Sequence, residues 1–248
     1  MYILKVPSLW AFFVAKLRQI MTTAVFIDGA FFVKRLRHYL PKANYYNATM
    51  IADIAMTMAL KHLKLRHDKN KSNDELYRIF FYDCPPLEKK MHRPISKTAL
   101  DLSKSDEAIF RKALHKELIK KRKFALRLGR LSDYHGGWKL KPAVLADLLK
   151  QKRTWESLTD DDFAIDISQK GVDMRIGVDI ASVALKGQAN RIVLIAGDAD
   201  FVPASKLARR EGVDFILDPM HQTIPDDLFE HIDGLWNAFP KDNDKGTS

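Results

Sequence analysis

Aspartates stand at or near the ends of apolar runs in three separate stretches of this chain: VFIDGAFF (Asp28), QKGVDMRIGVDI (Asp173) and VLIAGDADFVPA (Asp198 and Asp200). The carboxyl ends of parallel strands form the crevice where ligands bind, so we expect these acids to meet there. Two carboxylates roughly 4–5 Å apart repel by about 3–4 kcal/mol at an effective dielectric near 20. A divalent cation removes that penalty, and oxygen ligands suit Mg²⁺ or Mn²⁺. The pattern predicts a metal-dependent phosphoryl-transfer site.

Each acid also has a purely structural interpretation. Asp28 is placed to cap the helix that follows it, and Asp200 directly precedes the predicted helix FVPASKLARR. Asp198 has no predicted capping role and carries the strongest signal. Asp173 falls at the start of a predicted helix, inside its apolar arc, where the helix dipole also favours an acid. Asp179, on the same helix, is an additional candidate whose alternative is a structural hydrogen bond, and Asp83, after the second strand, is another.

Alternating apolar strands and amphipathic helices must position these acids. We expect strands at residues 24–27, 76–82, 124–131, 163–167, 191–196 and 213–217, and helices at residues 31–40, 48–65, 172–186, 201–210 and 225–236. Residues 133–142 and 66–75 are expected loops, and residues 144–159 are amphipathic but weakly specified. We also expect an insertion from about residue 87 to residue 122, with its own helix marked by Phe110, Leu114 and Leu118. This order predicts an α/β three-layer sandwich with a mostly parallel central sheet and a helical basic insertion.

The charge of the chain favours a polyanionic partner. The formal net charge is +10 and the pI is near 9.5, so nucleic acid is the expected class of partner, although solubility alone can explain such a charge. Two basic stretches are candidates for phosphate contact, and their alternative is a solvated helix face. The RNA-binding candidates are Lys34, Arg35, Arg37, Lys120, Lys121, Arg122, Lys123, Arg127 and Arg130.

The ends of the chain and its single cysteine add smaller constraints. With Cys84 alone, no intrachain disulfide and no cysteine zinc site can form, which fits a reducing cytoplasm. No apolar run is long enough to span a membrane. Residues 1–20 are interpreted as an amino-terminal extension, with translation from Met21, a docked helix and membrane association as alternatives. The expected domain covers residues 21–236, and residues 237–248 are an expected disordered tail.

Four motifs in combination resemble a known family: VFIDGAFF, FFYDCPP, QKGVDMRIGVDI and VLIAGDADFVPASKLARREGVDFIL. They are similar to the successive motifs of the NYN domain in its LabA-like branch, within the PIN-like superfamily of metal-dependent nucleases. The resemblance covers roughly residues 23–218. It implies that Asp28, Asp173, Asp198 and Asp200 bind the metal and serve catalysis. Many members have Asn three residues after the first Asp, whereas this chain has Phe31.

The resulting interpretation is a cytoplasmic endoribonuclease that uses Mg²⁺ or Mn²⁺ to hydrolyse phosphodiester bonds in single-stranded RNA. One alternative is a non-catalytic RNA-binding or regulatory module on the same fold, which Phe31 favours. A second is a small-phosphate enzyme, against which the +10 charge argues. The sequence leaves open whether the chain forms a homo-oligomer.

Overall fold

The computed structural model describes residues 21–63, 74–132 and 137–240, and its centre is a parallel sheet. Six strands lie in the order β12-β11-β10-β1-β2-β5, and every neighbouring pair is parallel. The strands are β1 (Thr22–Asp28), β2 (Glu75–Asp83), β5 (Phe124–Leu128), β10 (Arg191–Ile195), β11 (Asp214–Asp218) and β12 (Gly234–Leu235). The expected α/β sandwich with a parallel central sheet is confirmed.

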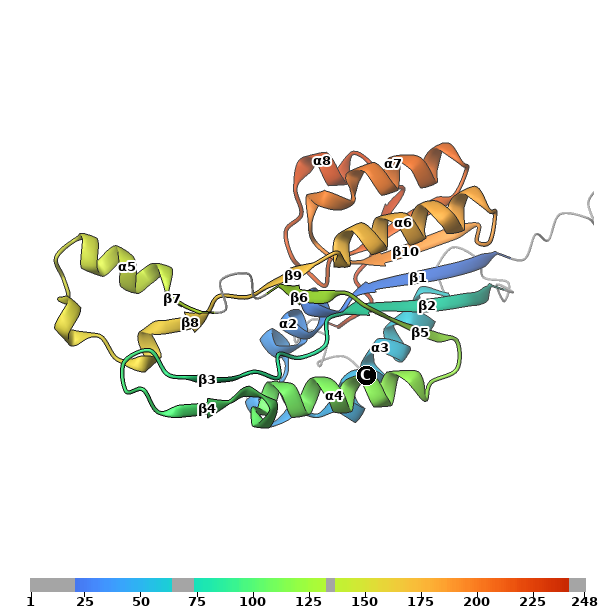
Figure 1. Ribbon diagram of the computed structural model, residues 1–248. Coiled ribbons are helices and arrows are strands. Elements are labelled where there is room, and N and C mark those ends of the chain that lie inside the picture. The colour runs from blue at the N-terminus through green and yellow to red at the C-terminus, as the bar shows by residue number, and fades with distance from the viewer. Residues whose placement is uncertain (1–20, 64–73, 133–136, 241–248) are drawn as a thin grey trace, which may run out of the picture.

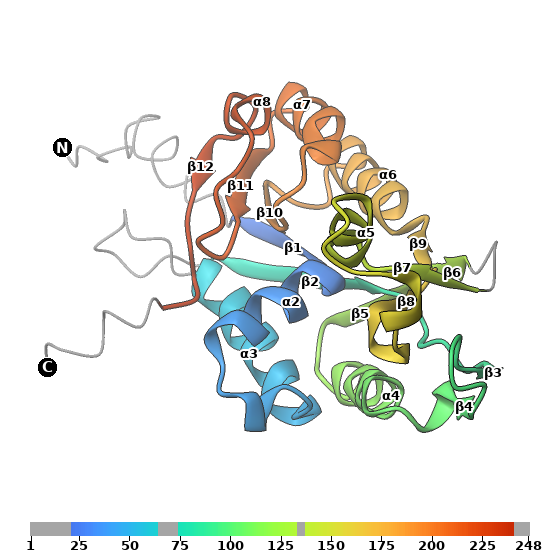
Figure 2. The same ribbon diagram turned by 90° about the vertical axis from the view of Figure 1, so that its left-hand side faces the viewer.

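Helices cover both faces of the sheet, as Figures 1 and 2 show. One face carries α2 (Gly29–Tyr39), α3 (Ala48–His62) and α4 (Asp106–Ile119), and the other carries α6 (Val172–Leu185), α7 (Val202–Arg210) and α8 (Asp226–Phe229). Side chains of β1 alternate between the two cores: Ile27 enters the core beneath α2, α3 and α4, and Phe26 enters the core beneath α6, α7 and α8. Five consecutive residues of β1 are buried for this reason, because a parallel strand inside three layers has no solvent-facing side.

The register brings the strand ends to one edge of the sheet. Ile27 lies opposite Ile195 of β10, and Asp28 lies opposite Tyr82 of β2. The residues that follow β1, β2 and β10 therefore share this carboxyl edge, as the sequence predicts for Asp28 and Asp198.

A second group of elements projects from the carboxyl edge (Figure 1). We call residues 137–170 the arm. It contains β7 (Trp138–Leu140) paired with β8 (Phe163–Ile165), the helix α5 (Pro142–Leu149), and the short 3-10 turns Trp155–Ser157 and Asp160–Asp162. At its base, β9 (Ser168–Lys170) pairs with β6 (Arg130–Ser132). The hairpin of β3 (Lys90–His92) and β4 (Ala99–Asp101) lies beside it, and Nε1 of Trp138 donates to the His92 carbonyl. Figure 2 views the molecule from the side of the arm.

Most expected elements are present, with four corrections. The strand predicted at 124–131 ends at Leu128, because Gly129 turns the chain and residues 130–132 leave the sheet to pair with β9. The strand predicted at 163–167 ends at Ile165 and pairs with β7, which lies in an expected loop. The amphipathic segment at 144–159 is helical only from Pro142 to Leu149.

The fourth correction concerns the carboxyl-terminal helix, which ends at Phe229 instead of residue 236. The chain there becomes the edge strand β12, fixed by the Asp233 carboxylate, which accepts a hydrogen bond from the Phe215 backbone N–H. Ala238, in the expected disordered tail, is buried against the sheet. The remaining tail, residues 1–20 and most of the predicted loop at 66–75 lie outside the described residues.

The predicted insertion at 87–122 takes a different form from the one expected. Its helix, α4, is the crossover between the parallel neighbours β2 and β5, and Phe110, Leu114 and Leu118 pack into the core. The projecting part is instead the β3–β4 hairpin together with the arm. Among the described residues, no helix has the length and apolar character needed to cross a membrane.

Candidate active site at the carboxyl edge

Asp28 occupies the turn between β1 and α2. Its carboxylate accepts hydrogen bonds from the backbone N–H groups of Ala30 (3.0 Å) and Phe31 (3.1 Å) and so caps α2. Gly29 makes this turn possible, since a Cβ there would lie 2.5 Å from the Tyr82 carbonyl oxygen. Asp28 is therefore both a helix cap and a half-buried acid at the strand end, and its orientation is fixed by two backbone donors.

Asp198 and Asp200 follow β10 through Gly197. The Asp198 carboxylate accepts the Asp200 N–H at 3.2 Å and caps the 3-10 turn Ala199–Phe201, which contains Asp200. This reverses the predicted assignment, in which Asp200 was the cap and Asp198 had no capping role. Both side chains are exposed, so both carboxylates face solvent at the carboxyl edge.

Asp173 is the second residue of α6, after Gly171, whose φ of 76° requires glycine. The five apolar residues predicted to face the core (Val172, Ile176, Ile180, Val183 and Ala184) are all buried. Asp173 itself is exposed, which corrects the expectation that it faces the core. The first turn of α6 directs it out of the packed face, toward the edge where the strands end.

The pKa values of Asp28 and Asp173 show that neighbouring acids act on both of them. The pKa of Asp28 is raised to about 6: burial is the largest cause, the charges of Asp173 and Asp83 also raise it, and the two backbone hydrogen bonds oppose the rise. Partial desolvation of its carboxyl group raises the pKa of Asp173, as do the charges of Asp198 and Asp200. The structure thus brings together acids from β1, α6 and the turn after β10, which are far apart in the sequence.

The donor set fits a hard divalent cation by its chemistry. Among the described residues, no group of three or more Asp, Glu, His or Cys side chains converges closely enough to hold a metal by itself. Mg²⁺, however, usually keeps several water ligands and takes only one or two carboxylates from the protein. Mutually repelling, solvent-facing carboxylates are the groups that such an ion would stabilise.

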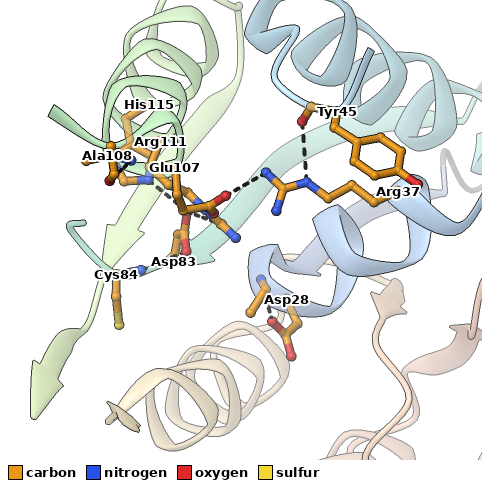
Figure 3. Close-up of polar contacts among 11 residues, drawn as sticks. Asp28, Arg37, Tyr45, Asp83, Cys84, Glu107, Ala108, Arg111 and His115 are labelled. Carbon is orange, nitrogen blue, oxygen red and sulfur yellow. Dashed lines mark hydrogen bonds and ion pairs between the residues drawn. The ribbon is translucent and has the colours of Figure 1, made fainter. Parts of the chain in front are cut away.

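Asp83, an additional candidate, is already paired. Its carboxylate is buried, and accepts hydrogen bonds from Arg111 Nη1 (2.8 Å) and the Cys84 N–H (2.9 Å), with His115 Nε2 at 2.9 Å (Figure 3). Burial alone would raise the pKa of Asp83, but His115 and Arg111 together hold it below the usual value. The structure therefore assigns Asp83 to stabilising α4 against β2.

We expect Asp83→Ala to lower the free energy of unfolding by about 3 kcal/mol, because it leaves the largely buried Arg111 guanidinium without its main carboxylate. The melting temperature should fall by roughly 10 °C in thermal circular dichroism. Since the folded pKa of Asp83 is depressed, its contribution is present at neutral pH and lost as pH falls through that value. The exposed Asp53, paired with Lys121, is the control: Asp53→Ala should change stability by less than about 1 kcal/mol.

The Asp179 carboxylate also has other partners than a metal site. It accepts the Tyr82 hydroxyl at 2.7 Å and lies 3.4 Å from Arg127 Nε. The structural hydrogen bond weighed as its alternative is therefore present.

The basic candidates divide into two groups by position. Lys120, Lys121, Arg122 and Lys123 precede β5 and so lie at the amino edge of the sheet, opposite the aspartates. Three of them contact acids: Lys120 contacts Glu117, Lys121 contacts Asp53 and Lys123 contacts Glu75. The structure does not bring this stretch together with the candidate site.

Most of the remaining basic candidates lie on elements that follow the carboxyl ends of strands, such as α2 after β1 and β6 after β5. Arg35 donates to the Met220 carbonyl, and Arg37 pairs with Glu107, so both stabilise α2. Lys34 and Arg130 are exposed. Arg130 lies opposite Lys170 in the β6–β9 pair, and Lys170 is close in the chain to Asp173. Lys170 and Arg175, which flank Asp173, were not singled out from the sequence.

Phe31 contacts the loop that carries Asp198. A Cβ on Gly197 would lie 2.8 Å from a Phe31 ring carbon, so the ring packs directly against this glycine. An apolar ring therefore lies where many members of the resembled family have an amide.

Sequence reasoning missed the ion network on α4. Glu107, Arg111 and His115 lie on one face of that helix at successive steps of four residues, and Glu107 also reaches Arg37 on α2. The i, i+4 spacing of Glu107 and Arg111 was a visible signal, but Asp83, the common partner of Arg111 and His115, comes from another element.

Comparison with known proteins supports the motifs. Residues 143–228 match the NYN domain family, and this segment, from α5 into α8, contains Asp173, Asp198 and Asp200. A crystal structure of a protein of unknown function from Vibrio parahaemolyticus is similar at 14% identity and a TM-score of 0.40, covering 88% of this chain and 93% of that chain. No curated protein matches.

Proposed function

We propose that this chain is an NYN domain protein and a metal-dependent ribonuclease whose site lies at the carboxyl edge of the sheet. The observation that carries the proposal is that acids from β1, α6 and the turn after β10 lie close enough for their charges to act on one another: Asp173 raises the pKa of Asp28, and Asp198 and Asp200 raise the pKa of Asp173. The match over residues 143–228 supports the reaction class, since the NYN domain is a nuclease-type domain. We propose residues 21–236 as the extent of that domain.

The four acids would hold Mg²⁺ or Mn²⁺, one or two of them directly and the others through the water ligands of the ion, and the metal would supply activated water and neutralise charge on the phosphate. Two backbone N–H groups orient Asp28, and the Asp200 N–H orients Asp198, so these carboxylates need little rearrangement before they bind. Asp173 and Asp200 are exposed and would complete the oxygen donor set from the solvent side.

The proposed substrate is single-stranded RNA. The net charge of +10 favours a polyanion. Two exposed cations, Lys170 and Arg175, flank Asp173 in the chain, and a third, Arg130, lies opposite Lys170 in the β6–β9 pair. Lys34, exposed on α2 after Asp28, offers a further cation. These side chains would bind phosphates on either side of the cleaved bond.

The direct test is incubation of purified protein with labelled single-stranded RNA and, separately, with a small phosphomonoester, each with and without Mn²⁺. RNA cleavage only with the metal supports the proposal. Turnover of the monoester alone would identify a small-phosphate enzyme instead.

A non-catalytic RNA-binding module is the second candidate, and the Phe31 ring packed against Gly197 favours it. In that case the protein would bind RNA and metal without cleaving RNA.

The position of the cations gives a second prediction. Replacing Arg130, Lys170 and Arg175 by Ala should weaken RNA binding and flatten its salt dependence, by roughly 0.7 in the log–log slope for each phosphate that is no longer neutralised. Replacing Lys120, Lys121, Arg122 and Lys123 should leave the slope close to that of the unmodified protein, because those residues lie at the opposite edge. Filter binding at several salt concentrations measures both. The reverse result would place the RNA at the amino edge.

A further inference from the structure

A small pocket opens beside the candidate site, where β2 ends. Its volume is about 220 Å³, and apolar side chains form most of its wall, among them Pro85, Pro86, Leu102, Leu131 and Ile165. Asp83 lines the pocket and also contributes to the raised pKa of Asp28, which lies on the adjacent strand. A group bound here would therefore lie next to a phosphate held at Asp28.

The wall of the pocket is also connected to the proposed site through the β6–β9 pair. Leu131 belongs to β6, whose partner β9 leads through Gly171 into Asp173. A larger hollow, of about 570 Å³, lies over α3 and residues 238–240 and includes none of the four acids. The smaller pocket is below the roughly 300–1,000 Å³ of sites for whole small molecules, so it suits a single ring system.

Besides Asp83, whose carboxylate is paired with Arg111 and His115, Glu107 and Arg111 supply the charged groups of this pocket (Figure 3). The Glu107 carboxylate accepts hydrogen bonds from Arg111 Nε and Arg37 Nη2, each at 2.7 Å. Its side chain remains 43% exposed, and a carboxylate has about four lone-pair sites, so both oxygens can accept further bonds. Arg111 uses Nε and Nη1 in its ion pairs, and within the described residues its Nη2 has no hydrogen-bond partner.

We propose that this pocket binds a guanine base of the RNA, between apolar walls, with Glu107 and Arg111 at its Watson–Crick edge. Guanine presents there an acceptor, O6, beside two donors, N1–H and the 2-amino group. The salt-bridged pair offers the complement, with a guanidinium donor next to two carboxylate acceptors. The inference rests on the proposed function, since it takes RNA as the substrate.

Other bases match this pair less well. Uracil has a single N–H donor between two acceptors, so one carboxylate oxygen would face a carbonyl. Adenine has one amino group and no N1–H donor. Cytosine has one amino donor beside two acceptors and would use only one carboxylate oxygen. Bases held on this edge in apolar pockets are a general mode of RNA recognition.

Binding of free nucleotides to the metal-free Asp198→Asn variant tests the pocket without cleavage. GMP, IMP, AMP, CMP and UMP are titrated by ligand-observed NMR. We expect GMP to bind most tightly, and IMP, which lacks only the 2-amino group, roughly tenfold more weakly. Glu107→Gln should weaken GMP binding roughly tenfold to a hundredfold, whereas Glu117→Gln, paired with Lys120 near the other end of α4, should leave it unchanged.

The outcomes separate the two proposals. Equal binding of GMP and IMP overturns the pocket, and this comparison needs no substitution at Glu107, so it holds even if Glu107→Gln fails to fold. Equal binding of all five nucleotides, together with metal-dependent cleavage at every base, overturns the pocket and leaves the nuclease standing. A GMP preference that Glu107→Gln removes, in a protein that cleaves no RNA, supports the pocket and overturns the nuclease.

Discussion

Asp198→Asn is expected to abolish cleavage of RNA while leaving the fold intact. Asn accepts the Asp200 N–H as a cap almost as well as Asp does, so the 3-10 turn should keep its conformation. The substitution removes one negative charge from a group of acids that repel one another, and therefore should keep or slightly raise the melting temperature without metal. Loss of one preorganised electrostatic group typically costs about a hundredfold to a thousandfold in rate.

Single-turnover cleavage of labelled RNA measures the rate, and thermal circular dichroism measures the fold. Asp226→Asn, at an exposed acid in the first turn of α8, is the matched control and should cleave normally. Cleavage by Asp198→Asn at the rate of the unmodified protein would contradict the assignment. Unfolding of the variant would instead show that Asp198 is needed as a cap.

The second large effect expected is stabilisation by Mg²⁺ or Mn²⁺. A ligand that binds only the folded state at about one hundred times its dissociation constant contributes roughly 2.7 kcal/mol. For a chain of this size the melting temperature should rise by roughly 5–10 °C. In the double variant Asp28→Asn, Asp173→Asn the shift should vanish, although Asn at position 28 can still cap α2.

The same stabilisation should depend on pH through Asp28. Its folded pKa, about 6, lies above the ordinary value of 3.8, so the protonated form is favoured in the fold. The stability that this preference contributes is complete below the ordinary pKa and is lost as pH rises through about 6. Metal competes with that proton, and the rise in melting temperature should therefore be larger at pH 7.5 than at pH 5. Equal shifts at the two pH values would exclude Asp28 from the metal site.

The parallel core could be predicted because its strands and helices carry strong local signals. Continuous apolar runs such as AVFI and IVLI indicate strands covered on both faces, and the buried stripe of α6 follows from its period alone. The edge strand β12 could not be predicted, since two residues of strand have no period and depend on Asp233 reaching the Phe215 backbone.

Charges were harder to place than strands. Asp83, Asp198 and Lys121 all look free in the sequence, yet the first meets Arg111, the second caps a turn, and the third contacts Asp53 on another helix. The pairs Asp83–Arg111 and Asp53–Lys121 join elements distant in the chain, so sequence spacing carries no record of them, whereas Asp198 forms a local cap that was expected of Asp200. What the sequence did predict is the edge at which acids gather.

The base of the arm has a consequence for how such a protein diversifies. Ser132 lies opposite Ser168 in the β6–β9 pair, so the chain leaves the body and returns to it at one point. An excursion with adjacent ends can be lengthened, shortened or exchanged without altering the order of the sheet, as insertions at surface loops generally can. Descendants of one ancestral gene can thus inherit the acidic edge unchanged while acquiring different arms, and target choice can evolve separately from chemistry.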